Sequence, residues 1–383
     1  MEEKVLLFKD RKSLSYIYYL QPDIIFKSNL FYLMKNNLKI ILDNIVFSLQ
    51  KAGGISTYWF ELYSRVLRDY DDVYFVEREN DNIVAKQHVI GKEKILSTGV
   101  SNLLVDRFVN VSLRNLNEKF IFHSSYNRIT SHKKAKQVLT VHDFVHEKYY
   151  SGVRRFLHSY QKGKAINTAD AIITISENTK KDLLTFFPNI NSNKIYVIYN
   201  GVSEDFYPLK KEAIKNDFLF IGSREKYKNF DFAVKAIAQT DRFKLNIVGC
   251  VLRKDEVEIL NRLIPGRWEL FNNIENAKLN ELYNQAYALI YPSSYEGFGI
   301  PLLEAMKTGC PFIALNSSSI PEVAGKAGVL IDKLEIAVFN EAVLNIDKKR
   351  EEIIKMGFEQ VKNFSWEKCY QETIQVYKDL YRS

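Results

Sequence analysis

Apolar and polar positions alternate along the chain in a regular succession from about residue 38 onward. The apolar run Leu38–Phe47 predicts a buried strand, and the stretch 52–70 predicts an amphipathic helix that follows a pair of glycines. With the next apolar run this makes a βαβ unit. Further runs in the first half predict strands at 73–77, 119–125, 137–143, 171–176 and 195–200, and helices around 151–168 and 177–187. The first half is therefore predicted to be a doubly wound α/β domain.

A second alternating region follows a polar segment at 201–217 that contains Pro208, where we place the linker between two domains. Beyond it, strands are predicted at 217–222, 244–249, 268–272, 287–293, 311–315 and 328–332, and helices at 229–239, 253–263, 278–286, 301–308, 319–324 and from Asn340 to the end. We expect an extension (1–36), a first domain (37–208), a second domain (209–365) and a last helix, 366–383, that packs back on the first domain. A ligand would lie between the carboxyl ends of the two sheets.

Length, charge and cysteine content add further constraints. A chain of 383 residues is longer than one hydrophobic core usually grows, which also favours two domains. The net charge of +8 suits an anionic partner such as a nucleotide, a nucleic acid or a lipid surface, and does not choose among them. The three cysteines are far apart and form no Cys/His cluster of zinc spacing, so we expect a reducing cytoplasm.

The most apolar N-terminal stretch, Tyr16–Met34, is interrupted by Pro22, Asp23 and Lys27 before it reaches the length of a membrane span. It also lacks the small-residue cleavage site of a signal peptide. Two interpretations stay open: a peripheral membrane segment, and a surface arm packed on the core.

The candidate chemistry is concentrated in Tyr291–Pro311, where Glu296 and Glu304 flank a Gly-Phe-Gly-Ile-Pro turn. Gly297 and Gly299 permit a close approach of the backbone, and Pro301 suits the first position of a helix. The unpaired N–H groups at such a helix start attract anions, so the loop is a candidate phosphate site.

Two carboxylates would repel a phosphate, and their suitable partners here are hydroxyl groups. A nucleotide sugar offers hydroxyls on both sides of its diphosphate. We therefore expect Glu304 to hold the ribose and Glu296 the transferred sugar. The amides between them, on Gly297, Phe298, Gly299 and Ile300, would hold the diphosphate. The alternative is an ordinary first-turn helix acid at 304 and a solvated acid at 296.

A second loop supports a diphosphate site. A predicted strand runs through Gly222 and Ser223 into a loop with Arg224, Lys226 and Lys228, just before a helix. Cations at the carboxyl edge of a sheet are suited to neutralise a diphosphate, most strongly as charge builds on a leaving group. A solvated basic turn is the alternative.

With these residues the sequence resembles the retaining GT-B glycosyltransferases of family 4. Its signature is the Glu-x7-Glu pattern from Glu296 to Glu304. Similar landmarks run from about residue 37 to the end: KAGGISTYW, VHDFVHEKYY, ISENTKKDL, YNGVSEDFYP and IGSREKYKNF. Many relatives place the arginine directly after the glycine, whereas here Ser223 intervenes. The resemblance implies two Rossmann-like domains facing across a cleft, with the acceptor bound mainly by the first and the donor mainly by the second.

The resemblance also implies roles for individual residues. Arg224 and Lys228 would clamp the diphosphate, Glu304 would hold the ribose, and Glu296 would contact the donor sugar. Gly54, with Gly53, matches the glycine pair that approaches the donor. His142 matches the histidine that reaches the donor sugar near the reacting carbon.

The implied activity is transfer of a mannosyl- or glucosyl-type hexose from a nucleotide-diphosphate sugar to a glycan or lipid-linked acceptor in surface-polysaccharide synthesis. The implied mechanism is front-face attack, in which the departing phosphate oxygen takes the acceptor proton, with neither metal nor cofactor. The setting would be the cytoplasm, at or near the inner face of the cell membrane.

Two other features of the sequence, a pair of histidines and a basic stretch, each allow two interpretations. His142 and His146 have a spacing that suits a metal only on a helix, whereas the preceding residues predict a strand, so no metal is expected. His123 is either a cleft residue or a structural histidine. The basic, tyrosine-containing stretch 147–165 is either a membrane or lipid-diphosphate contact or a solvated helix face.

Nucleic acid is not expected as a partner, because the basic residues are dispersed among acids and no nucleic-acid motif is visible. Two other functions remain open on the residues alone. One is a nucleotide-sugar epimerase on the same architecture, and the other is a non-catalytic basic binding module.

Overall fold

A computed structural model describes residues 38–383, apart from 88–89, 98–101, 114 and 211–212. The predicted N-terminal extension, 1–36, lies outside the described residues. So does the apolar stretch Tyr16–Met34, whose two interpretations therefore stay open.

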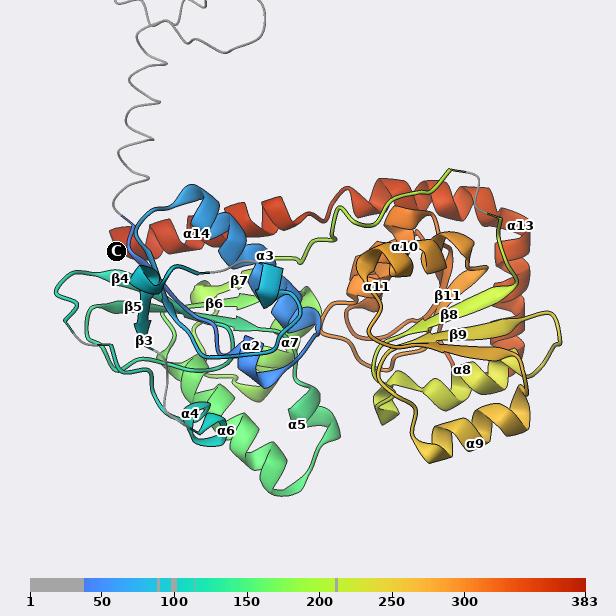
Figure 1. The fold of residues 1–383 in the computed structure, drawn as a ribbon, viewed down its shortest axis with the longest axis horizontal. Coiled ribbons are helices and arrows are strands. Elements are labelled where there is room, and N and C mark those ends of the chain that lie inside the picture. The colour runs from blue at the N-terminus through green and yellow to red at the C-terminus, as the bar shows by residue number, and fades with distance from the viewer. Residues whose placement is uncertain (1–37, 88–89, 98–101, 114, 211–212) are drawn as a thin grey trace, which may run out of the picture.

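The first half forms a parallel sheet with the strand order β3-β2-β1-β4-β5-β6-β7 among the described residues (Figure 1). The strands are β1 (Ile40–Asp43), β2 (Val73–Val76), β3 (Ile95–Ser97), β4 (Phe120–Ser124), β5 (Ala135–Val141), β6 (Ala171–Thr174) and β7 (Ile195–Val197). The helices are α2 (Val46–Leu49), α3 (Gly54–Asp69), α4 (Leu103–Asp106), α5 (Val145–Tyr149), α6 (Gly152–Thr168) and α7 (Glu177–Phe186), with 3-10 turns at Ala85–Gln87, Lys92–Lys94 and Ser192–Lys194. The central strands are buried on both faces, as expected for a sheet covered by crossover helices.

The second half forms another parallel sheet, with the order β10-β9-β8-β11-β12-β13. Its strands are β8 (Asp217–Ile221), β9 (Lys244–Val248), β10 (Trp268–Phe271), β11 (Ala288–Tyr291), β12 (Phe312–Leu315) and β13 (Val329–Ile331). Its helices are η4 (Lys226–Lys228, a 3-10 turn), α8 (Phe230–Ile237), α9 (Lys254–Leu263), α10 (Asn276–Gln285), α11 (Ile300–Thr308), α12 (Ile320–Ala324) and α13 (Ile336–Val361). Figure 1 shows α10 and α11 on one face of this sheet and α8 and α9 on the other. The prediction of two doubly wound α/β units is confirmed.

The last helix returns to the first sheet. The long helix α13 packs on α11 and β13 and is kinked at Lys349, and α14 (Trp366–Arg382) then runs back over α3 (Figure 1). Tyr370 and Tyr377 of α14 lie in the first core, and the Tyr370 hydroxyl donates to Asp69 at 2.8 Å. Near the crossover, a Cβ on Gly201 would lie 2.1 Å from the backbone nitrogen of Trp366, so this close chain contact requires glycine.

One predicted strand is too long. The run Leu38–Phe47 is a strand only over Ile40–Asp43, and Val46–Leu49 forms the short helix α2. Strand β1 pairs with both β2 and β4 over those four positions, after which the chain leaves the sheet. Val46 and Phe47 remain buried in helical form, so their hydrophobicity does not distinguish the two structures.

Candidate functional site

The predicted phosphate loop joins β11 to α11. Gly299 precedes the helix with φ of 108°, a left-handed conformation that favours glycine. The helix therefore begins at Ile300, one residue earlier than predicted, and Pro301 is its second residue. Proline is tolerated there because the N–H groups of the first turn have no partner within the helix. In this turn Pro301 has no N–H, and the N–H of Leu302 donates to the carbonyl of Gly299 at 3.0 Å, so an anion would be bound by the N–H of Ile300 and by the loop before it.

Glu304 was predicted to lie in the first turn of α11, but it lies in the second turn. The Tyr283 hydroxyl of α10 donates a hydrogen bond to Oε2 of Glu304 at 2.8 Å. Burial raises the pKa of the Glu304 carboxyl to about 7, although the hydrogen bond from Tyr283 acts to lower it. An ordinary first-turn acid is exposed and interacts with the helix dipole, so Glu304 does not match that alternative.

Lys228 and Glu296 form a direct ion pair. The Nζ atom of Lys228 lies 2.5 Å from Oε1 of Glu296, and both side chains are largely buried. The two residues follow β8 and β11, which are neighbouring parallel strands, so their carboxyl ends share one edge of the sheet. Asn229 joins the loops, because its side-chain amide donates to the carbonyl of Pro292 at 2.8 Å and to Oγ of Ser294 at 2.7 Å.

Arg224 points elsewhere. Its Nε donates to Glu256 of α9 at 2.9 Å, and its Nη2 donates to the carbonyls of Cys250 and Val251 at 2.9 and 2.8 Å. Nη1 is buried and has no hydrogen-bond partner among the described residues. Gly222, two residues before it, has φ of 120°. The guanidinium thus anchors the loop on α9, and its predicted contact with a diphosphate stays a prediction.

The first domain meets the predicted phosphate loop through Gly54 and His142. Gly54 is the first residue of α3, and a Cβ there would lie 3.8 Å from Cδ1 of Ile300, so the two helix starts face each other. His142 follows β5, and its carbonyl oxygen would lie 2.0 Å from a Cβ on Gly297. Only glycine fits at that contact.

The His142 imidazole is held neutral. Its ring lies edge-on to Tyr58, with 5.0 Å between ring centroids. Burial lowers its pKa to about 4, Lys162 lowers it further, and Asp143 acts in the opposite direction. At neutral pH this ring therefore suits a hydrogen bond with a sugar hydroxyl better than an ion pair.

Both halves of the chain match known family models. Residues 203–360 match the model described as "Glycosyl transferases group 1", and residues 52–206 match "Glycosyltransferase Family 4". The chain belongs to glycosyltransferase family 4. The two facing α/β sheets are the GT-B fold predicted from the resemblance.

Named relatives and a solved structure are similar to this glycosyltransferase. O-antigen chain mannosyltransferase B of Escherichia coli is 28% identical over 286 residues, which cover 68% of this chain and 74% of that protein. O-antigen chain mannosyltransferase RfbU of Salmonella typhimurium is 30% identical over 220 residues, 55% of this chain and 61% of that protein. The structure of Anabaena HepE in complex with UDP and glucose superposes with a TM-score of 0.68 at 14% identity, covering 88% of this chain and 99% of that one.

The contacts that join the two domains of this glycosyltransferase were not predicted from the sequence. The Ser176 and Thr179 hydroxyls donate to the carbonyl of Gly297 at 2.7 and 3.2 Å. The carboxylate of Glu322, on α12, accepts the N–H groups of Glu177 and Asn178 at 2.9 and 3.0 Å. Ser176 is a residue type that favours a helix N-cap, and this was the one sequence signal near these contacts. Nothing in the sequence indicates that α12 lies beside α7.

The remaining histidines have structural partners. His123 lies in β4 and is fully buried, with Thr140 2.9 Å from Nε2 and the Tyr377 hydroxyl 2.5 Å from Nδ1, which confirms its structural interpretation. His146 lies in α5, and its ring stacks on His158 of α6 with 3.7 Å between centroids.

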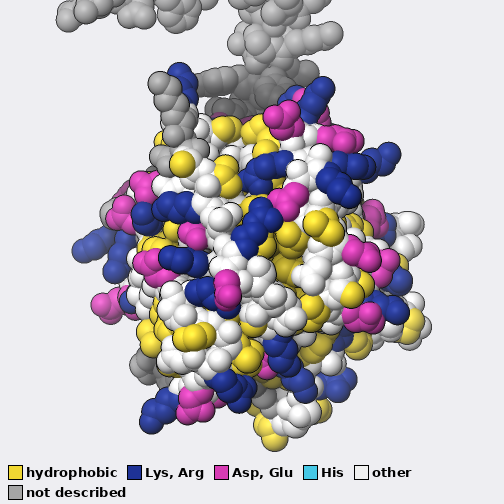
Figure 2. Space-filling view, turned by 90° about the vertical axis from the view of Figure 1, so that its right-hand side faces the viewer, with side chains coloured by type: hydrophobic (Ala, Val, Ile, Leu, Met, Phe, Trp, Pro, Cys, Tyr) yellow, Lys and Arg dark blue, Asp and Glu magenta, His cyan; other side chains and the backbone are white. Residues whose placement is uncertain are grey.

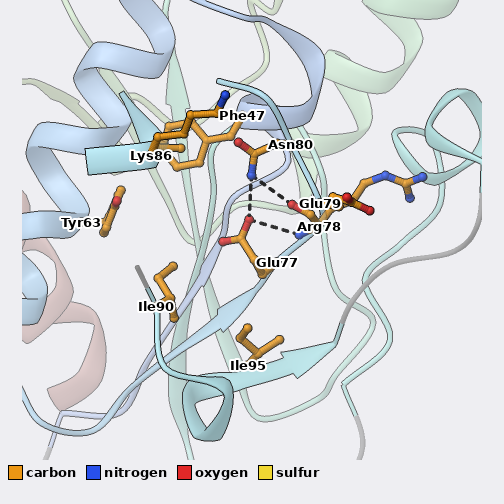
Figure 3. A pocket seen from close by; sticks show the side chains of 10 residues that line it. Phe47, Tyr63, Glu77, Arg78, Glu79, Asn80, Lys86, Ile90 and Ile95 are labelled. Carbon is orange, nitrogen blue, oxygen red and sulfur yellow. Dashed lines mark hydrogen bonds between the residues drawn. The ribbon is translucent and has the colours of Figure 1, made fainter. Parts of the chain in front are cut away.

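The glycosyltransferase also has a pocket of about 330 Å³ in its first domain (Figure 3). Figure 3 shows Glu77, just after β2, hydrogen-bonded to the Asn80 side chain beside Arg78, with Phe47 and Tyr63 also lining the space. Burial raises the pKa of Glu77. None of the predicted donor residues lines this pocket.

Proposed function

We propose that this glycosyltransferase moves a mannosyl- or glucosyl-type hexose from a nucleotide-diphosphate sugar to a glycan or lipid-linked acceptor of a surface polysaccharide, with retention of anomeric configuration. The second domain, 209–365, holds the donor, and the first, 37–208, holds the acceptor. The names of the mannosyltransferase relatives support the choice of sugar and pathway class.

The observation that carries the proposal is the Lys228–Glu296 pair beside the start of α11. A cation, a carboxylate and the N-terminus of α11 lie together at the carboxyl edge of one sheet. The start of α3 and the neutral His142 approach from the other domain. This combination offers a seat for a diphosphate flanked by acceptors for sugar hydroxyls.

The proposed chemistry assigns each group a task. Lys228 and the α11 amides take the diphosphate, and its arrival draws Lys228 away from Glu296, which then accepts a hydroxyl of the hexose. Glu304 accepts from the ribose, and His142 binds a hexose hydroxyl.

In the transfer step the acceptor oxygen bonds to the anomeric carbon on the face from which the phosphate leaves. The bond between that carbon and the phosphate oxygen breaks, and the departing oxygen takes the acceptor proton. Lys228 and the amides stabilise the charge that develops on the diphosphate.

Two further features support the acceptor side and the compartment. The pocket at Glu77 combines a carboxylate and an amide with aromatic side chains, a composition suited to carbohydrate hydroxyls and ring faces. All three cysteines are free, which is typical of a reducing cytoplasm.

The test is a calorimetric screen of guanosine, uridine and adenosine diphosphate sugars, followed by turnover with the sugar that binds. Lys228→Ala and Glu304→Ala should each abolish donor turnover. Lys226→Ala, which removes an exposed cation from the same loop, should leave it unchanged. Unchanged turnover in both site variants would refute the assignment, and sugar conversion without any acceptor would indicate an epimerase.

A further inference from the structure

Helix α6 carries an apolar stripe on the side that faces solvent. Its inner face is formed by the buried residues His158, Gln161, Lys162 and Ala165. The opposite face exposes residues spaced i, i+3, i+4 and i+7: Val153 (73% exposed), Phe156 (67%), Leu157 (42%) and Tyr160 (66%). This spacing normally marks the face that a helix buries, so these four residues, the α6 stripe, are positioned to contact something outside the chain.

The charged residues of α6 all have one sign. Lys148, before the helix, is paired with Asp182 at 2.6 Å, but Arg155 and Lys164 are exposed on α6, and the chain contains no acidic residue between Glu147 and Asp170. Glu147 does not offset them, because it is buried and its carboxylate lies 2.8 Å from Nζ of Lys162. By contrast, Figure 2 shows basic and acidic side chains interspersed over the end of the molecule formed by the second domain.

The segment that neighbours α6 is also apolar and exposed. Val105, Phe108 and Val109, at and after α4, are all exposed. Two contacts tie this segment to α6: the side-chain amide of Gln161 donates to the carbonyl of Arg107, and Nζ of Lys164 donates to Oδ1 of Asn110 at 2.9 Å. The apolar surface therefore extends beyond a single helix.

We propose that the α6 stripe docks the protein on an anionic lipid surface. The four apolar side chains would enter the headgroup boundary, and Arg155 and Lys164 would lie at the level of the lipid phosphates. Aromatic and aliphatic side chains beside cations match such a boundary, whereas a nucleic acid would gain little from the apolar stripe.

A second copy of the chain fits this face less well. In a twofold dimer the same surface meets itself, so the cations beside the stripe would face one another.

A protein that docks on a membrane surface needs no spanning segment. Within the described residues, no helix has the length and hydropathy to cross a bilayer.

The docked orientation would bring the junction of the two domains close to the lipid. Helix α5 precedes α6, and its Tyr149 ring contacts Tyr227 and Tyr295 of the second domain, with centroid separations of 5.1 and 5.9 Å. A lipid-linked acceptor would therefore present its headgroup near the interdomain cleft. This last step depends on the proposed function, but docking itself does not.

The experiment is co-sedimentation of the full chain with phosphatidylglycerol-containing vesicles and with phosphatidylcholine vesicles. Wild type should bind the anionic vesicles only, and the binding should weaken as salt is added. Phe156→Asp and Tyr160→Asp should each weaken it about tenfold or more, because an apolar side chain is lost and a negative charge is added. Leu344→Asp, at an exposed apolar position on α13, is the matched control and should bind like wild type.

Several outcomes would overturn the proposal. One is equal binding of the stripe variants and wild type, which would place the contact elsewhere, including residues 16–34. Another is equal binding of zwitterionic and anionic vesicles. A third is a wild-type dimer in light scattering that Phe156→Asp dissociates without changing vesicle binding. Donor affinity, measured by calorimetry, should be unchanged in the stripe variants, and Lys228→Ala should still bind vesicles, so the two proposals fail separately.

Discussion

Replacing Glu304 by glutamine should stabilise the empty protein while it weakens donor binding. Glutamine keeps the size of the side chain and an oxygen that accepts from the Tyr283 hydroxyl, but it removes the buried carboxylate. The wild-type carboxyl has a pKa of about 7 in the folded protein against 4.5 for the unperturbed group. Between these two values the folded state holds a proton that the unfolded state has released.

The sign of the pH effect follows from this difference. The stabilisation of the folded state that comes from the raised pKa of Glu304 is fully present below pH 4.5. It is lost as the pH rises through about 7. From pH 5 to pH 8 the loss amounts to about 2.5 kcal/mol in the wild type, and the glutamine variant does not incur it. The free energy of unfolding of Glu304→Gln relative to wild type should therefore rise by about that amount over the same range.

Urea unfolding at pH 5, 6, 7 and 8 measures this difference, with Glu341→Gln, an exposed position on α13, as the matched control. The control should differ from wild type by the same amount at every pH. Donor affinity of Glu304→Gln should fall about tenfold or more, because the oxygen that would accept from a ribose hydroxyl is already bonded to Tyr283. A constant stability difference across the pH range would refute the buried carboxylate, and an unchanged donor affinity would refute the ribose contact.

Three further variants test other parts of the site. If ionised Glu304 accepts a ribose hydroxyl, donor affinity should increase as the pH rises through the pKa of Glu304. Tyr283→Phe removes the hydrogen bond that lowers this pKa, so the pKa should rise, and the increase in affinity should move to higher pH in calorimetric titrations. Gly297→Ala places a Cβ 2.0 Å from the carbonyl oxygen of His142; we expect about a hundredfold loss of turnover with little change in the thermal unfolding of the second domain. Glu256→Ala leaves its guanidinium partner buried and uncompensated, and urea unfolding should show a loss of about 3 kcal/mol.

The sequence was sufficient for most strands and for the residues at their ends. Strands such as β8 and β11 are short apolar runs bounded by turn residues, and a loop after each run must lie at the carboxyl edge of a parallel sheet. Strand β3 was missed because it is a three-residue edge strand with too few apolar positions to show a period. The start of α11 was off by one residue, because a left-handed glycine can precede a helix at either position.

Contacts between distant residues could not be obtained in this way. Lys228 and Glu296 meet because β8 lies between β9 and β11, and strand order is not encoded in the hydrophobic period of any single strand. The side-chain direction of Arg224 was equally inaccessible. A basic loop can present a cation to a ligand or turn it inward, and here a buried carboxylate on α9 supplies the inward partner.

The contacts between the domains would connect donor binding at the proposed site to domain closure. The carbonyl of Gly297, within the loop that would hold the diphosphate, accepts hydrogen bonds from Ser176 and Thr179 of the first domain. Glu322 supplies an anion to the N-terminus of α7, where unpaired N–H groups and the helix dipole favour negative charge. Because the Ser176 and Thr179 hydroxyls hold the carbonyl of Gly297, separation of the two domains would release this loop from one side. The geometry of the proposed diphosphate site would thus depend on closure, and a donor that needs this geometry should in turn favour the closed state.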